Sequence, residues 1–142
     1  MKTVRHVARA VGSTGSTMPA YRVDLHVGTH RLVADEVAAA GGADAGPSPF
    51  GLLLSGLAAC TAMTLRMYAS RHGWDLTTIE VDVRYDITEG SPASIARTIT
   101  VPHHLPAEQR ERLADIAERT PVTVAVRAGT PINTTIRADD TN

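Results

Sequence analysis

The stretch that decides the fold is residues 47–72, PSPFGLLLSGLAACTAMTLRMYASRH, the longest apolar part of the chain. Between Leu52 and Leu65, only one serine and two threonines interrupt the run of apolar or small residues. A helix that is apolar on every side is typically a buried helix. We therefore expect a central helix from about residue 50 to residue 72. It would be roughly 30 Å long at 1.5 Å per residue, and other elements must cover it.

The residues at both ends of this stretch support a helix with these limits. Pro47 and Pro49 disfavour helical backbone in the residues before them, and Ser48 can cap the first turn. Gly73 suits a left-handed cap at the other end. The uninterrupted apolar part is shorter than the roughly 20 residues that a bilayer requires, so we expect no membrane span.

Composition places the chain among small globular proteins. Its 142 residues suit a single domain, residues 1–142, with 43% hydrophobic and 4% aromatic residues. The formal net charge of −1 and the lack of a basic run argue against nucleic acid or an anionic membrane as partner. The one cysteine, Cys60, cannot form an internal disulfide, and residues 1–11 contain no long apolar segment. Both observations favour the cytoplasm.

Alternating apolar and polar residues predict strands before the central helix. Residues 21–27 alternate as a half-buried strand, and residues 31–35 can return as its hairpin partner. Residues 3–11 fit a short strand and a short amphipathic helix equally well. We expect a turn at residues 12–19 and a long loop at residues 36–49.

A second hairpin is expected after the central helix. Residues 74–87 contain the clearest alternation in the chain, and residues 94–101 repeat it after a turn. In the second strand, one face carries Ile95, Arg97, Ile99 and Val101. Such a pair is typical of an antiparallel hairpin with one wet face and one face packed on a helix.

The rest of the chain completes an α+β domain. An amphipathic outer helix opens at Pro106, and residues 122–127 fit a strand or a short helical turn. Residues 132–137 are expected to form a last strand. Because a single sheet cannot cover every side of an apolar helix, a second copy of the chain would supply the missing cover. We therefore expect a homodimer.

Several of these segments resemble one known family. The matching segments are Asp35-Glu36, Gly41-Gly42, GPSP at 46–49, LLLSGLAACTAMTLRMYASRHGW at 52–74 and AERTPV at 117–122. They are similar to the OsmC family, which comprises osmotically inducible protein C and the organic hydroperoxide resistance proteins. The resemblance covers roughly residues 20–137. It implies antiparallel sheets wrapped around the long central helices of an intertwined homodimer.

The resemblance also implies a chemistry, and the chain departs from its pattern. Active members of the family reduce organic hydroperoxides with two cysteines, assisted by an arginine and a glutamate. Cys60 matches the first cysteine, but Thr120 stands where the second is expected. Phe50 and Gly51 follow Pro49 where the family has its glutamate, and no N-terminal arginine aligns.

Two interpretations of Cys60 remain open at this point. A peroxidatic cysteine reacts as a thiolate, which apolar surroundings disfavour unless a positive charge or a donor compensates. Arg119, next to the position of the missing cysteine, is our candidate for that charge, and Glu36 for the missing carboxylate. Without such partners, Cys60 would be a small, inert hydrophobic residue of the helix.

These interpretations give two hypotheses about function. The first is a thiol-dependent hydroperoxide reductase of oxidative-stress defence, in which Cys60 is oxidised and an external thiol restores it. The second is a catalytically silent dimer that binds a small apolar ligand in the interface pocket around Cys60. We expect no cofactor and no metal, because the histidine pairs His26 with His30 and His103 with His104 lack further ligands at metal-binding spacing.

Overall fold

The computed structural model describes residues 3–12 and 21–138. The chain forms two compact units, residues 1–56 and residues 57–142, and helix α1 (Pro49–Arg71) runs from one into the other. The bounds of α1 agree with the expected central helix. The turn expected at residues 12–19 lies outside the described residues except for Gly12, and the single domain stays a prediction.

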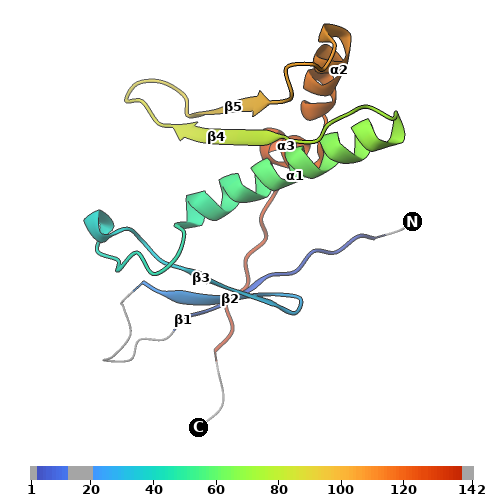
Figure 1. Ribbon diagram of the computed structural model, residues 1–142. Coiled ribbons are helices and arrows are strands. Elements are labelled where there is room, and N and C mark those ends of the chain that lie inside the picture. Colours follow the sequence, from blue (N-terminus) through green and yellow to red (C-terminus); the bar gives the residue numbers. More distant parts are fainter. Residues whose placement is uncertain (1–2, 13–20, 139–142) are drawn as a thin grey trace. The chain divides into compact units, whose positions relative to one another are not determined.

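The first unit contains a three-stranded antiparallel sheet (Figure 1). Its strands, in the order in which they pair, are β1 (Arg9–Gly12), β2 (Val23–Val27) and β3 (His30–Ala34). The hairpin of β2 and β3 confirms the prediction, and Gly28 turns it with a left-handed φ of 60°. Of the two structures that residues 3–11 allowed, the chain adopts the strand from Arg9 on, while residues 3–8 have no regular secondary structure.

A buried carboxylate organises the loop that leads from β3 to α1. Asp35 is almost fully buried, and its carboxylate accepts the backbone N–H of Glu36 at 2.8 Å and those of Ala43 and Ala45 at 3.1 Å each. The loop also contains the short 3-10 helix η1 (Ala38–Ala40). One side chain thus accepts hydrogen bonds from three backbone N–H groups of the loop, outside any strand or α-helix.

Two glycines allow this loop to close tightly. A Cβ atom on Gly42 would lie 1.9 Å from the carbonyl oxygen of Glu36. One on Gly46 would lie 2.3 Å from the carbonyl oxygen of Val33. Both contacts are with backbone atoms, so the loop could not accept a side chain at either position without moving.

We expect Asp35→Asn to lower the melting temperature at pH 7. Burial raises the pKa of the Asp35 carboxyl, but the N–H donors of Ala45, Glu36 and Ala43 lower it more, so that it lies below the usual 3.8. Because the folded-state pKa is the lower one, this stabilisation is present above the unfolded-state pKa and is lost as the pH falls through the folded-state pKa. Thermal unfolding from pH 7 to pH 3 should show the difference from wild type shrinking below about pH 4.

The matched control for this prediction is Asp44→Asn. Asp44 is an exposed carboxylate of the same loop with a positive φ of 53°, a conformation that asparagine also adopts. This variant should melt with the wild type at every pH. An Asp35→Asn protein that also melts with the wild type would show that the three N–H bonds do not stabilise the loop.

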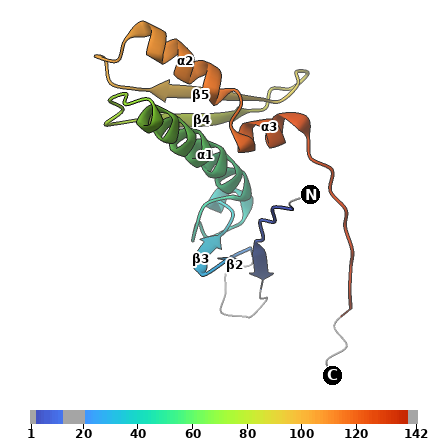
Figure 2. The same ribbon diagram turned by 90° about the vertical axis from the view of Figure 1, so that its right-hand side faces the viewer.

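The second unit packs a hairpin against helices (Figure 2). Besides the larger part of α1, it contains β4 (Glu80–Asp86), β5 (Ser94–Thr100), α2 (Ala107–Ala117) and α3 (Pro121–Ala128). As predicted, strands β4 and β5 pair antiparallel, and Val83 lies opposite Arg97 in the pair. The small antiparallel sheets and helices confirm the α+β class in the described residues. The intertwining of two copies stays a prediction.

Two expectations about the C-terminal part have different outcomes. Residues 122–127, for which strand and helical turn were both open, lie in helix α3. The strand expected at residues 132–137 is wrong, since the segment has no regular secondary structure. A strand needs a neighbour to pair with. Ile132 and Ile136 are instead almost fully exposed in this segment.

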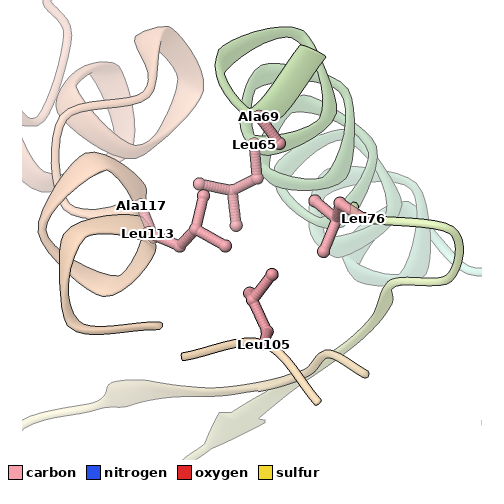
Figure 3. Packing of buried hydrophobic residues seen from close by; sticks show 6 residues of the cluster. All are labelled: Leu65, Ala69, Leu76, Leu105, Leu113 and Ala117. Carbon is pink, nitrogen blue, oxygen red and sulfur yellow. The ribbon is translucent and has the colours of Figure 1, made fainter. Parts of the chain in front are cut away.

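The core of the second unit lies between α1, α2 and the segments that flank the hairpin (Figure 3). Leu65 of α1 and Leu113 of α2 point toward one another in its centre. The buried residues of this core are Leu65, Ala69, Leu76, Leu105, Leu113 and Ala117. The apolar stripe predicted for α2 is therefore the face that this helix buries.

Leu65→Ala should destabilise the protein by about 2–5 kcal/mol, the usual cost of truncating a fully buried leucine. Leu65 has no exposed surface, so the missing methyl groups would leave a cavity in the core. Urea unfolding followed by circular dichroism measures the loss. Ile87→Ala removes a similar side chain that is mostly exposed, and it should cost less than about 0.5 kcal/mol. Equal losses in the two variants would contradict the proposed core.

Within the chain, α1 is buried along one stripe only. The buried residues are four apart: Leu57, Thr61, Leu65 and Ala69. The other elements of one chain cover only this face of α1, and the expected cover of its other sides by a second copy stays a prediction. Apolar side chains such as Leu53, Met63 and Met67 remain exposed, with Met63 at 63%.

Helix α1 is also the one helix in the described part of the chain that could cross a membrane by length and composition alone. The core helix of a soluble protein meets the same criterion, so this finding is weak evidence for a span. The expected lack of a membrane span stays a prediction.

Candidate functional site

Cys60 lies in the middle of α1, directly beside the buried stripe. It is a free cysteine and is partly buried. Thr61, the next residue, belongs to the buried stripe and is fully buried. At 3.6 residues per turn, the two side chains point about 100° apart around the helix axis. Cys60 therefore lies at the edge of the face of α1 that Thr61 helps to bury.

An arginine from the hairpin packs on Thr61. Arg97 of β5 has only 11% of its side chain exposed. Its Nη1 donates to the Oγ1 of Thr61 at 3.0 Å and to the Oγ1 of Thr123 at 2.8 Å. Its Nη2 donates to the carbonyl oxygen of Ala117 at 3.0 Å and to Oε1 of Glu118 at 3.3 Å. One guanidinium thus links α1, the end of α2 and α3.

The position of the expected second cysteine belongs to the same group of residues. Thr120 is fully buried and stands just before Pro121, the first residue of α3. Its hydroxyl lies 2.6 Å from the hydroxyl of Thr123, the acceptor of Arg97. The residues joined in this way, which we name the Arg97 cluster, are Thr61, Arg97, Glu118, Thr120 and Thr123.

Glu118 connects the cluster to the surface. Its carboxylate accepts hydrogen bonds from Arg127 and from Arg97, and the Arg127 guanidinium also donates to its carbonyl oxygen at 3.2 Å. The bond from Arg127 lowers the pKa of Glu118, burial opposes this by raising it, and the charges of both arginines lower it further. Glu118 therefore stays ionised between two permanent cations, so the three groups carry one net positive charge.

The arginine expected to serve Cys60 lies elsewhere. Arg119 is more than half exposed and pairs with Asp115 one helical turn earlier. The buried arginine is instead Arg97, which was not among the residues predicted for the site. Its signal was present, since Arg97 shares a strand face with Ile95 and Ile99. Glu36 belongs to the first unit, and its expected role stays a prediction.

The histidines were not expected to form a metal site. In the described ranges, no group of three or more histidine, cysteine, aspartate or glutamate residues is arranged to hold a metal ion. His104 instead lies with its Nε2 at 3.1 Å from Oδ2 of Asp75. This pair is at the surface, with each side chain about half exposed.

Comparisons with known proteins bear on this arrangement. The family model of the OsmC-like proteins matches residues 41–135, which include Cys60 and the whole Arg97 cluster. No curated protein sequence matches the chain.

Several solved structures share the fold. An organic hydroperoxide resistance protein OsmC from Legionella pneumophila is 20% identical, with 89% of this chain and 92% of that chain covered and a TM-score of 0.65. An OsmC-like protein from Mycoplasma pneumoniae is 16% identical, with coverage of 90% and 91% and a TM-score of 0.68. An organic hydroperoxide resistance protein from Elizabethkingia anophelis with bound thiocyanate is 20% identical, with coverage of 91% and 93% and a TM-score of 0.64.

Proposed function

Since the chain belongs to the OsmC-like family, we propose that it is a thiol-dependent peroxidase of oxidative-stress defence that reduces organic hydroperoxides through Cys60. The observation that carries the proposal is the Arg97 guanidinium, 3.0 Å from the hydroxyl of the residue that follows Cys60. Arg97 thus places a buried guanidinium on the residue next to Cys60, and reactive cysteines in proteins typically lie in electropositive surroundings. The names of two structural neighbours, organic hydroperoxide resistance proteins, support the substrate class.

The proposed reaction needs no cofactor. The Cys60 thiolate attacks the outer oxygen of the hydroperoxide, the O–O bond breaks, and a proton completes the alcohol product while sulfur keeps one oxygen as a sulfenic acid. An external thiol then displaces that oxygen as water and forms a mixed disulfide. A second external thiol releases Cys60 and leaves as a disulfide. Because Cys60 is the only cysteine, the chain cannot resolve its own sulfenic acid within one protomer.

The experiment that tests this function is a titration of the wild-type protein with cumene hydroperoxide. In the presence of dimedone, which traps sulfenic acids, one equivalent should label Cys60 and consume the peroxide. Without dimedone or thiol, excess peroxide should carry Cys60 to the sulfinic or sulfonic acid, a mass gain of two or three oxygen atoms. A Cys60 that stays reduced under excess peroxide would refute the function.

We further propose a cytoplasmic homodimer in which the exposed face of α1 is covered by the second copy. Met63 and Met67 leave this face apolar, and soluble proteins rarely expose a contiguous apolar surface of this kind. Met63→Glu would place a charge in the interface and should convert the dimer into monomers. Size-exclusion chromatography with light scattering measures the mass.

The control for the dimer is Ile87→Glu, at an exposed apolar residue just beyond β4. This variant should keep the mass of the wild type. A Met63→Glu protein with the dimer mass would show that the exposed face of α1 is not the interface.

The second candidate function is a silent dimer that binds a small apolar ligand beside Cys60. Thr120 favours it, since a hydroxyl cannot form the disulfide that a second cysteine would form. In that case an apolar fluorescent probe should bind the dimer, and modifying Cys60 with iodoacetamide should block the binding, while peroxide leaves the thiol intact. Oxidation of Cys60 by one equivalent of peroxide would favour the peroxidase.

A further inference from the structure

We infer that the second unit binds a small, singly charged organic ammonium ion in a hollow between α2 and the aromatic residues near the end of α1. The hollow has a volume of about 610 Å³. Ligand pockets usually measure roughly 300–1,000 Å³. Tyr68 and Trp74 line one side, and α2 lines the other with Glu108, Glu111, Arg112 and Asp115. This Trp74 hollow, as we name it, shares no residue with the Arg97 cluster.

The aromatic side of the hollow is supported by the core behind it. Tyr68 and Trp74 are partly buried and pack against the core residues of Figure 3. Their rings meet edge to face with centroids 5.5 Å apart, and His72 stacks on Tyr68 at 4.2 Å. The backbone N–H of Trp74 donates to the carbonyl oxygen of Ala69 at 2.9 Å. The two rings thus offer a ligand a surface that is ordered before binding.

Tyr68 already holds a cation of the protein itself. The Cζ atom of Arg112 lies 5.7 Å from the centroid of the Tyr68 ring, and Nε of Arg112 donates to the phenolic oxygen at 2.9 Å. Aromatic faces attract cations through their quadrupole, and tryptophan attracts them most strongly. Among the described residues, no cation lies over the ring of Trp74. This ring is therefore the one that a cationic ligand would occupy.

The carboxylates around the hollow outnumber the cations. Asp115 pairs with both Arg112 and Arg119. In residues 3–12 and 21–138, the side chains of Glu108 and Glu111 make no hydrogen bond or ion pair. Three carboxylates against two guanidinium groups leave one net negative charge. Because Glu108 lies in the first turn of α2, where the helix dipole stabilises an anion, Glu111 is the least compensated of the three.

These features favour an alkylated ammonium ion over an anion or a metal ion. The apolar substituents of such a cation pack on the Trp74 ring while its charge lies near Glu111. An anion would instead lie near two unpaired glutamates. The one cation that lines the hollow, Arg112, already bonds Tyr68 and Asp115.

The fluorescence of Trp74 reports binding directly, because it is the only tryptophan of the chain. Choline is the probe, and choline chloride replaces sodium chloride stepwise so that the screening of charges stays constant. We expect a saturable change in emission. The alcohol 3,3-dimethylbutan-1-ol has the shape of choline without its charge and should bind at least about fivefold more weakly. Its anionic counterpart, 3,3-dimethylbutanoate, should bind more weakly still.

Two variants of α2 change the charge of the hollow in opposite directions. Glu111→Gln removes the uncompensated carboxylate and should weaken choline binding about fivefold. Arg112→Gln removes the resident cation and should strengthen it by about threefold. The matched control is Glu89→Gln in the turn between β4 and β5, which should bind choline like the wild type. Since a loosened fold would weaken binding in both α2 variants, the opposite signs separate charge from stability.

Several results would overturn the inference. They are a wild-type protein without a saturable response to choline, an alcohol that binds as well as choline, and a carboxylate that binds better. Equal affinities of Glu111→Gln and Glu89→Gln, or weaker binding in Arg112→Gln, would overturn it as well. Cys60 does not line the hollow, so Cys60→Ser should bind choline like the wild type whether or not the proposed peroxidase is active.

Discussion

Replacing Cys60 with serine is expected to reduce hydroperoxide turnover to the level without protein. The sulfur is the only atom in the proposed site that can take an oxygen from the peroxide and return it as water. A serine hydroxyl is not an ionised nucleophile at neutral pH and forms no sulfenic acid. Loss of cumene hydroperoxide in the presence of dithiothreitol measures the rate. The substitution exchanges one atom, so far-ultraviolet circular dichroism should match that of the wild type.

The control for this variant lies on the same helix. Ser55 is exposed, and its hydroxyl donates to the carbonyl oxygen of Gly51. Ser55→Ala should keep the wild-type rate because it removes only this local bond. Turnover that persists in Cys60→Ser, measured against dithiothreitol alone, would assign the activity to another group and refute the reaction proposed for Cys60.

Replacing Arg97 with leucine is expected to lower the free energy of unfolding by about 2–4 kcal/mol. Leucine fills part of the space but donates no hydrogen bond, so the carbonyl oxygen of Ala117 loses its Arg97 donor in a buried position. Thr61 and Thr123 each keep one of their two hydrogen bonds. Since a domain of this size is stable by about 5–15 kcal/mol in total, the loss is a large fraction.

Arg84→Leu is the matched control, because Arg84 lies on the adjacent strand and makes its ion pair with Asp86 at the surface. Exposed pairs of this kind contribute about 0–1 kcal/mol, so the loss should be no larger. Urea unfolding of both variants measures the difference between them. If Arg97→Leu and Arg84→Leu lost the same amount, the Arg97 cluster would have no structural role.

The sequence predicted the elements better than it predicted their environment. The two hairpins follow from alternation, which depends only on neighbouring residues, and β2–β3 and β4–β5 formed as expected. The burial of α1 depends on how much of the helix the other elements can cover. Within one chain these elements cover only the stripe that includes Leu57 and Leu65. The strand expected at residues 132–137 fails for a similar reason, because alternation does not create a pairing partner.

In the candidate site too, features that depend on neighbouring residues were predicted, and contacts that depend on the tertiary fold were not. Cys60 and the threonine at position 120 were recognised from local motifs in the sequence. Arg119 was expected to supply the charge for Cys60 because it adjoins Thr120 in the chain, yet its guanidinium pairs with Asp115. Arg97, more than twenty residues away, reaches the site through the tertiary packing of β5. The sequence feature that indicated its burial was its position between Ile95 and Ile99 on one strand face.

The loop around Asp35 has a consequence for which sequences can encode it. The carboxylate of Asp35 accepts hydrogen bonds from the backbone N–H groups of residues 36, 43 and 45. These bonds therefore do not depend on the side chains at those positions. Gly42 and Gly46, by contrast, are fixed by the space that a Cβ atom would need. In a randomised library of residues 36–46, the folded members should therefore vary freely at residues 43 and 45. They should converge on glycine at positions 42 and 46, because a side chain has no room at either position.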